Sequence, residues 1–170
     1  MTDASPIERG HGVLRYHWGI WSAWAPQRWT LEFAVLCDGV VVGSQALSAH
    51  DFAVVRQVET GSWLGRAHQR QGIGTHMRQA VLHLAFEGLG AVLAVSAAFE
   101  DNPASLRVAA KLGYQPNGVD RIARRGRPAT LHRLRLPRDT WAATTRPTVH
   151  MAGQDDSCLS WFGLPPAGGS

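Results

Sequence analysis

The spacing of apolar residues alternates along the chain between a helical period and continuous strand-like runs, and the order of these changes predicts a mixed α/β fold. A helix places apolar residues on one face every three or four positions, whereas a buried strand reads as a short apolar run. In chain order, the pattern predicts a helix, three strands, a helix, a strand, a helix and two strands. The expected ranges are helices at 14–24, 72–88 and 103–112 and strands at 31–36, 40–47, 54–64, 91–98, 115–122 and 129–136.

Turn-forming and capping residues support these boundaries. Asp38-Gly39 stands between the first two strands, and Asp-Gly in that position is a strong hairpin signal. Asn102 can cap the third helix, in which Pro103 fits the first turn and Gly113 follows the end. The run 91–98 is apolar at nearly every position, which predicts a central parallel strand covered on both faces.

Three tryptophans mark the first helix. Trp18, Trp21 and Trp24 recur every three residues, so they are expected along one side of a helix that Pro26 ends. The stripe is expected either to pack on the sheet or, where it stays uncovered, to form a lid or a dimer surface.

Composition indicates one soluble globular domain spanning residues 1–170. Charged residues make up 18% of the chain and apolar residues 45%, which excludes an intrinsically disordered protein. Residues 1–10 are expected to be a loose lead-in and 142–170 a C-terminal extension with a short strand at 148–151. Two cysteines cannot make a disulfide framework, and no signal peptide or membrane-spanning run is recognisable, so a cytoplasmic protein is expected.

Arginines are concentrated near the C-terminal pair of strands. The cluster comprises Arg121, Arg124, Arg125, Arg127, Arg133 and Arg135. Three interpretations remain open, in order of preference: a solvated hairpin tip, a wall that attracts an acidic group or acyl carboxylate, and a nucleic-acid surface. The last is the least favoured because neither interleaved aromatic residues nor a wider basic face accompanies the cluster.

The segment Gln69-Arg70-Gln71-Gly72-Ile73-Gly74-Thr75 follows an apolar strand and opens a helix. Two glycines let the backbone approach a ligand closely, and the free N–H groups at a helix start attract anions. The segment lacks the Gly-Lys-Ser/Thr of a Walker loop and the third glycine of a dinucleotide fingerprint. A phosphate-binding turn of another kind is therefore predicted.

The residues from Trp63 to Thr75 resemble the acyl-CoA pyrophosphate loop of the GCN5-related N-acetyltransferases (GNAT), Gln/Arg-x-x-Gly-x-Gly/Ala. Downstream, 101–105 and 111–114 resemble the second CoA-contacting segment of that family in its RimJ/RimL branch. The resemblance covers about 33–141 and is greatest to actinobacterial RimJ/RimL-like members, some of which use succinyl-CoA. It implies a GNAT fold without its usual first strand and first helix.

The resemblance also implies an activity and a set of site residues. The expected reaction is acyl transfer from acyl-CoA, with acetyl favoured over succinyl, to a primary amine by direct attack. Glu59 is the expected base and Ser105 the expected acid, although a solvated glutamate and an ordinary first-turn serine remain alternatives. Tyr114 is expected to pack rather than donate a proton. The expected CoA-binding residues are Trp63, Leu64, Arg66, Gln69, Arg70, Gln71, Gly72, Ile73, Gly74, Thr75, Asn102 and Ser105.

Two further expectations concern partners. His50, His68, His76 and His83 have no cysteine or histidine at ligand spacing, so no metal site is predicted. A homodimer is considered because the tryptophan stripe could be uncovered. The rival functional class is a non-catalytic fold relative that binds acyl-CoA or a macromolecule, which would be favoured if the missing leading elements remove the acceptor-side walls.

Overall fold

The computed structural model describes residues 5–153 and 155–165, and its centre is a six-stranded mixed sheet. The strands are β1 (Arg28–Cys37), β2 (Val40–His50), β3 (Gln57–Leu64), β4 (Leu93–Phe99), β5 (Gln115–Arg124) and β6 (Arg127–Pro137). The helices are α1 (Pro6–Ser22), α2 (Phe52–Val55), α3 (Ile73–His83), α4 (Pro103–Leu112) and α5 (Arg138–Ala142). The strand order is β1-β2-β3-β4-β6-β5, and every neighbouring pair is antiparallel except β3 and β4. The predicted mixed α/β fold is confirmed.

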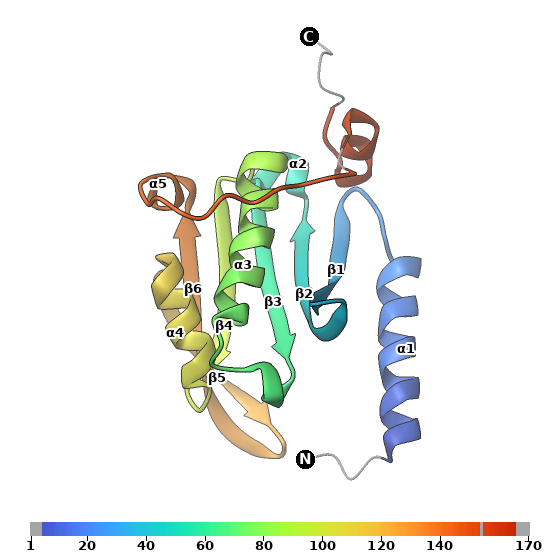
Figure 1. The fold of residues 1–170 in the computed structure, drawn as a ribbon, viewed down its shortest axis with the longest axis vertical. Helices are drawn as coiled ribbons and strands as arrows, with labels where there is room; N and C mark the ends of the chain where they lie inside the picture. The colour runs from blue at the N-terminus through green and yellow to red at the C-terminus, as the bar shows by residue number, and fades with distance from the viewer. Residues whose placement is uncertain (1–4, 154, 166–170) are drawn as a thin grey trace.

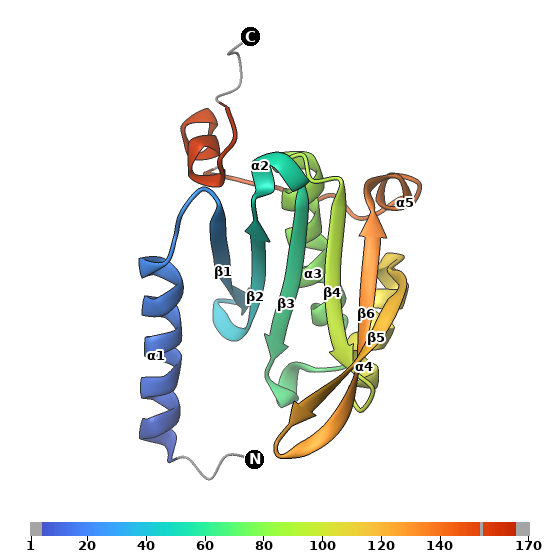
Figure 2. The same ribbon diagram turned by 180° about the vertical axis from the view of Figure 1, so that it is seen from behind.

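Helices α3 and α4 lie on the same face of the sheet (Figure 1). Helix α3 connects β3 to the parallel strand β4, and α4 connects β4 to the parallel strand β5. Both connections run in the same direction along the sheet, and because such crossovers are right-handed, both helices lie on one side. Seen from behind, the opposite face is not covered by a helix of the described chain (Figure 2). The sheet therefore has one packed face and one open face.

The open face contradicts the prediction that the central strand β4 is covered on both sides. Ala94, Ser96 and Ala98 are buried towards α3 and α4, whereas Val95 is half-buried and Ala97 is exposed. The apolar run was a correct signal for a strand, but an apolar run does not show whether a second layer covers the open side. Coverage by a second helical layer was wrong, since α1 lies beside the edge strand β1 rather than over β4 (Figure 2).

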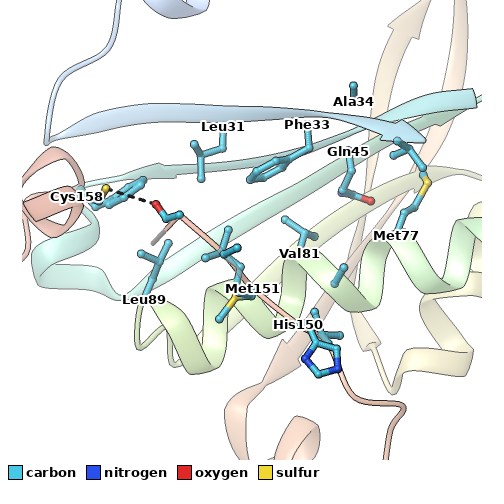
Figure 3. A pocket seen from close by; sticks show the side chains of 17 residues that line it. Leu31, Phe33, Ala34, Gln45, Met77, Val81, Leu89, His150, Met151 and Cys158 are labelled. Carbon is cyan, nitrogen blue, oxygen red and sulfur yellow. Dashed lines mark hydrogen bonds between the residues drawn. The ribbon is translucent and has the colours of Figure 1, made fainter. Parts of the chain in front are cut away.

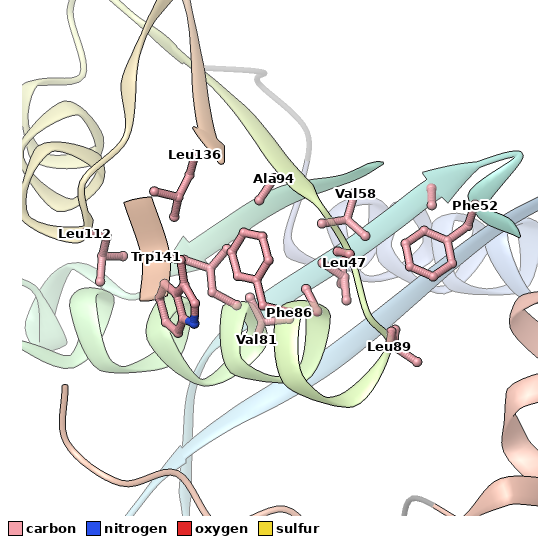
Figure 4. Packing of buried hydrophobic residues seen from close by; sticks show 14 of the residues in the cluster. Leu47, Phe52, Val58, Val81, Phe86, Leu89, Ala94, Leu112, Leu136 and Trp141 are labelled. Atoms are coloured by element: carbon pink, nitrogen blue, oxygen red, sulfur yellow. The ribbon is translucent and has the colours of Figure 1, made fainter. Parts of the chain in front are cut away.

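The hydrophobic core fills the space between the packed face and α3 (Figure 4). Phe86, in a π-helical turn at Leu84–Gly88 that extends α3, stacks on Trp141 of α5 with ring centroids 5.4 Å apart. Full burial of each large apolar side chain stabilises the fold by about 1.5–3 kcal/mol. The side chains that are essentially inaccessible to solvent include Trp29, Leu47, Phe52, Val58, Leu82, Phe86 and Leu136. This packing fixes α3, and with it the turn that precedes α3, against the sheet.

Helix α1 begins at Pro6, well before the predicted start at 14, so the expected loose lead-in is wrong for Pro6–Gly10, which is helical. A capping box explains the early start: the Glu8 amide donates to Ser5 Oγ, and the Ser5 amide donates to the Glu8 carboxylate at 2.6 Å. Residues 1–4 lie outside the described residues. The helix stops at Ser22, so Trp24 belongs to the following turn and packs on Trp29 instead of extending the stripe.

The other local predictions have mixed outcomes. Asp38 and Gly39 both have positive φ, at 50° and 80°, as expected for the predicted hairpin turn. The strand expected at 148–151 is not formed; this part of the tail runs as irregular chain past α3, where the Gln79 side chain donates to the Pro147 carbonyl at 2.9 Å. In the described ranges, no helix is long and apolar enough to cross a membrane. Ahead of β1 these ranges contain α1 and no strand.

Candidate active site

Strands β3 and β4 are paired over only part of their length. The parallel ladder joins Gln57–Glu59 to Leu93–Val95 and then stops. Beyond it, β3 continues to Leu64 against β2, while β4 continues to Phe99 against β6. The two strands therefore diverge, and at the start of the gap the Ser96 hydroxyl donates to the Thr60 carbonyl at 3.0 Å.

The glycine-containing turn lies directly after the free end of β3. A 3₁₀ turn at Arg66–His68 follows the strand, and the Gln69 side chain fastens the loop by donating to the Leu64 carbonyl at 3.0 Å. Gly72 adopts φ 84° and precedes the first residue of α3, a conformation that favours glycine. The amides of Ile73 and Gly74 are at the first positions of α3, where a helix provides no carbonyl partner, whereas the Thr75 amide already donates to the Gly72 carbonyl at 2.9 Å.

A cavity of about 380 Å³ lies between this turn, the end of β3 and the first turns of α3 and α4. Four cationic side chains line it, namely Arg70, Arg78, Arg107 and Lys111, and the lining contains no aspartate or glutamate. Two helix N-termini open onto the same space and add positive potential. The cavity is therefore suited to a ligand with several negative charges.

Most of the predicted CoA-binding residues line this cavity. Those on its wall are Leu64, Gln69, Arg70, Gly72, Gly74, Thr75, Asn102 and Ser105. Trp63, Arg66, Gln71 and Ile73 are not on its wall, and the exposed Trp63 is paired with Ser44 on the open side of the sheet. Sequence reasoning missed Arg78 and Arg107 on the cavity wall, because each is an unremarkable arginine within a helix until the two helices are brought together.

Asn102 holds the start of α4 at the cavity. Its side-chain oxygen accepts a hydrogen bond from the Ser105 amide at 3.2 Å, as an N-cap residue does. The cap fixes the backbone of Ser105, which lies on the cavity wall. The predicted capping role of Asn102 is confirmed.

Arg78 is the least exposed of the four cations, with 3% of its surface accessible. Its Nη2 donates to Ser62 Oγ at 2.8 Å, while Nε and Nη1 are buried without a hydrogen-bond partner. Burial lowers the pKa of this guanidinium, and the nearby Tyr114 opposes that effect. An arginine nevertheless stays protonated in proteins, so the cavity contains a buried positive charge.

Tyr114 lies beneath the gap and packs, as the sequence predicted. Its hydroxyl is 3.0 Å from Thr60 Oγ1, and 7% of the residue is exposed. Burial raises the pKa of this phenol, although the Thr60 hydrogen bond and Arg78 act in the opposite direction. The residue is part of the core cluster and does not line the cavity.

Glu59 and Ser105 are not brought to the same side of the sheet. Glu59 is exposed on the open face, opposite Ser48 of β2 and Val95 of β4, at the point where the β3–β4 ladder ends. Ser105 lines the cavity on the packed side. The gap between the diverging strands separates the two residues, so a reacting group held in the gap would have one of them on each side.

The arginines of the predicted cluster lie on both strands of the final hairpin, β5 and β6, and at the turn between them. Arg124 pairs with Asp101 at 2.7 Å and lies over the Phe99 ring, and Arg133 pairs with Asp120. Arg133 and Arg135 are opposite Ala97 and Val95, which places them on the open face. None of the six arginines of the cluster lines the cation-rich cavity.

A larger cavity of about 560 Å³ lies between β1, α3 and the tail (Figure 3). Its wall is mostly aliphatic and aromatic, with Leu31, Phe33, Met77 and Val81 pointing into it. It lacks the cations and helix N-termini that phosphate groups require, so the smaller cavity is the better candidate for the reaction site. No group of three potential metal-ligating residues occurs in the part of the chain that the structure describes.

Comparison with known proteins gives one family. Residues 8–115, more than half of the chain, match the family described as acetyltransferase (GNAT) domain. A solved structure described as "Probable acetyltransferase" is 26% identical, with a TM-score of 0.61 over 66% of this chain and 64% of its own. A GCN5-related N-acetyltransferase from Brucella melitensis is 24% identical, with a TM-score of 0.60 over 66% of this chain and 53% of its own. A variant of spermidine N-acetyltransferase SpeG from Vibrio cholerae shares the fold at 15% identity and a TM-score of 0.65, over 79% of this chain and 78% of its own.

This chain spans less than two thirds of the length of the first two of these structures. Residues 8–115, which match the family, include β3, the glycine-containing turn, α3 and α4, which together form the cation-lined cavity. The chain belongs to the acetyltransferase (GNAT) domain family.

Proposed function

We propose that this protein is an N-acyltransferase that moves an acyl group from acyl-CoA to a primary amine. The observation that carries the proposal is the cavity lined by four cations and no carboxylate, beside the gap between β3 and β4. CoA carries its negative charges on phosphates at one end and its reactive thioester at the other. The cavity could hold the phosphates while the thioester reaches the gap.

The phosphate end would lie at the turn before α3. Arg70, Arg107 and Lys111 are exposed side chains on the cavity wall, suited to phosphate oxygens that remain partly solvated. The amides at the start of α3 would contribute further donors without moving, because the helix already holds them in place. The CoA arm would then run along the unpaired edge of β3 towards the point where the ladder to β4 begins.

The acceptor would approach from the open face of the sheet. In direct attack, the amine nitrogen bonds to the thioester carbonyl carbon, the carbon–sulfur bond breaks, and the thiolate leaves with the electron pair of that bond. Glu59, at the end of the β3–β4 ladder, is the proposed acceptor of the amine proton, directly or through water. Ser105 is the proposed proton source for the thiolate, from the cavity side.

The motifs at 69–75, 101–105 and 111–114 support a place in the RimJ/RimL-like branch. On that basis, the proposed acceptor is a protein N-terminus, a lysine or a small amine. Because such an enzyme draws on a cellular acyl-CoA pool, we also propose a cytoplasmic location. We propose no nucleic-acid partner, because the arginine cluster lacks interleaved aromatic residues and a wider basic face.

We further propose a homodimer that covers α1. Ile7, Leu14, Trp18 and Trp21 follow helical spacing on one side of α1 and are all largely exposed. Exposed apolar patches of this kind are uncommon on monomers and mark interaction sites. The open face of the sheet is uncovered as well, so a second copy could bury both surfaces and supply a wall for the acceptor.

A non-catalytic protein that binds acyl-CoA is the second candidate. The uncovered open face favours it, because the acceptor side has no wall from a helix of the same described chain. Release of free thiol from acetyl-CoA and succinyl-CoA, measured with a panel of amines and peptide N-termini, separates the two. Amine-dependent release supports the transferase, whereas CoA binding by calorimetry without turnover for any amine supports the rival.

A further inference from the structure

A hollow of about 380 Å³ lies where the C-terminal end of α1 and the turn after it meet the tail. Four of the five side chains that line it are aromatic, namely Trp21, Trp24, Trp161 and Phe162, and the fifth is Cys158. We call it the tryptophan hollow. Trp24 and Trp161 are 137 positions apart in the sequence, so only the tertiary structure brings these rings together.

The deeper part of the tryptophan hollow is held in place by the protein itself. The rings of Trp24 and Phe162 have centroids 5.8 Å apart, and both pack on the buried Trp29, at 6.2 and 5.0 Å. The Trp24 Nε1 also donates to the backbone carbonyl of Trp161 at 3.0 Å, which joins the tail to the turn after α1. These rings are therefore positioned before any ligand binds.

The other two tryptophans of the hollow leave most of their surface in water. Trp21 is 65% exposed and Trp161 is 64% exposed. Large apolar side chains that stay exposed together are typical of interaction sites. Where an arginine of the described chain stacks on an aromatic ring, that ring belongs to Phe52, Phe99 or Trp141, and none of these lines the hollow.

The lining of the hollow favours an organic cation without N–H groups. Aromatic faces, those of tryptophan above all, attract cations, and quaternary ammonium ions are the ligands that clusters of such rings bind. An ammonium group with N–H donors would need acceptors, and the lining includes no carboxylate or hydroxyl side chain. A quaternary ammonium ion has no such requirement.

A negative charge next to the hollow points to the same class of ligand. The Asp155 carboxylate accepts a hydrogen bond from the amide of Cys158, one of the lining residues, at 3.2 Å. Hydrogen bonds from Ser157 and Cys158 lower the pKa of Asp155, so its carboxylate is ionised at neutral pH. The potential at the hollow therefore favours a cation over a neutral molecule of the same shape.

We infer that the tryptophan hollow is a binding site for a small quaternary ammonium ion of the choline type. Its methyl groups would contact the faces of Trp21 and Trp161, with Trp24 and Phe162 beneath them. The site is separate from the proposed donor cavity. The hollow lies beyond the start of β1, whereas the glycine-containing turn follows the opposite end of the sheet, where Leu64 pairs with Gly43 (Figure 1).

The test compares ligands that differ only in charge or in methylation, and it needs neither CoA nor turnover. Calorimetry compares choline with 3,3-dimethylbutanol, in which a carbon replaces the nitrogen, and with ethanolamine, which has the charge but no methyl groups. We expect the wild-type protein to bind choline at least about fivefold more tightly than either analogue, the ratio that cation–π contacts can supply.

Trp161→Leu removes one exposed ring and retains an apolar side chain, so it should abolish the preference for choline over 3,3-dimethylbutanol. Trp18→Leu is the matched control, because Trp18 is 59% exposed on α1 but does not line the hollow, and this variant should keep the preference. Trp21 also belongs to the proposed dimer surface, whereas Trp161 lies outside α1. Sedimentation velocity of Trp161→Leu should therefore match that of the wild-type protein.

Equal wild-type affinities for choline and 3,3-dimethylbutanol would overturn the inference, because the hollow would then be an ordinary apolar surface. A Trp161→Leu variant that keeps the preference or changes the oligomeric state would also overturn it, as would loss of the preference in Trp18→Leu. Binding of a trimethyl-lysine peptide without binding of choline would identify a protein partner instead of a small ion. The wild-type comparison decides the question even if Trp161→Leu does not fold.

Discussion

Replacing the two glycines of the turn one at a time separates backbone strain from ligand contact. Gly72 has φ 84°, and a Cβ added there would meet no atom within 4 Å. Gly74 lies in the first turn of α3, and its added Cβ would be 3.7 Å from the side chain of Val108, an ordinary contact. Neither alanine variant creates a clash within the protein, so the difference between them is conformational.

The magnitude follows from that geometry. A non-glycine residue in the left-handed region costs about 1–2 kcal/mol, whereas alanine in a helix is favoured over glycine by up to about 1 kcal/mol. If the turn keeps its shape in Gly72→Ala, the free energy of unfolding should fall by that amount. If the turn relaxes instead, CoA binding must restore the shape, and Kd should rise by about 5–30-fold. In both cases the loss in free energy of unfolding and the loss in free energy of CoA binding should sum to about 1–2 kcal/mol.

The assay is chemical denaturation of each variant with and without CoA, combined with calorimetry for CoA affinity. Gly74→Ala is the matched control for backbone strain: it should be at least as stable as the wild-type protein, so a loss of CoA affinity in this variant reports a lost ligand contact at the cavity wall. If Gly72→Ala retains both the stability and the CoA affinity of the wild type, the turn is not a strained phosphate site. If Gly74→Ala is the more damaging variant, the assignment of roles within the turn is reversed.

Three further predictions test the site and the assembly. Glu59→Gln should lower kcat by about 10²–10⁴ with little change in CoA affinity. Glu100→Gln, which changes another exposed carboxylate, is the control, and full activity of the Glu59 variant at every pH would exclude Glu59 as the base. Tyr114→Phe should cost about 1 kcal/mol of stability through the lost hydrogen bond to Thr60 and leave kcat within a few-fold; a hundredfold loss of kcat would instead identify Tyr114 as the acid. Because burial raises the pKa of Tyr114, the wild-type protein should lose stability above about pH 10 more steeply than Tyr114→Phe in denaturant titrations. Trp18→Ser with Trp21→Ser should convert a dimer into a monomer in sedimentation velocity, whereas a monomeric wild-type protein would contradict the proposed dimer.

Local signals in the sequence predicted local structure well. The Asp38-Gly39 turn and the Asn102 cap of α4 each depend on residues a few positions apart, so their sequence patterns carry the geometry directly. The start of α1 could also have been read from sequence, since Ser5 and Glu8 have capping-box spacing. The end of α1 was missed because a helical period cannot show that Trp24 gains more by packing on Trp29 and Phe162 than by extending the helix.

By itself, the sequence determined that the chain has a mixed α/β fold and a glycine turn between a strand and a helix, because periodicity and turn chemistry act over short distances. The tertiary structure alone decided which side chains meet at that turn. Arg78 and Ser62 are 16 residues apart, and Arg107 reaches the cavity from a different helix. Strand register placed Glu59 on the open face, the packing of α4 on the sheet placed Ser105 on the other side, and helix packing left Arg78 buried without an ion pair among the described residues. These relations depend on contacts between distant parts of the chain, which periodicity and local propensity do not encode.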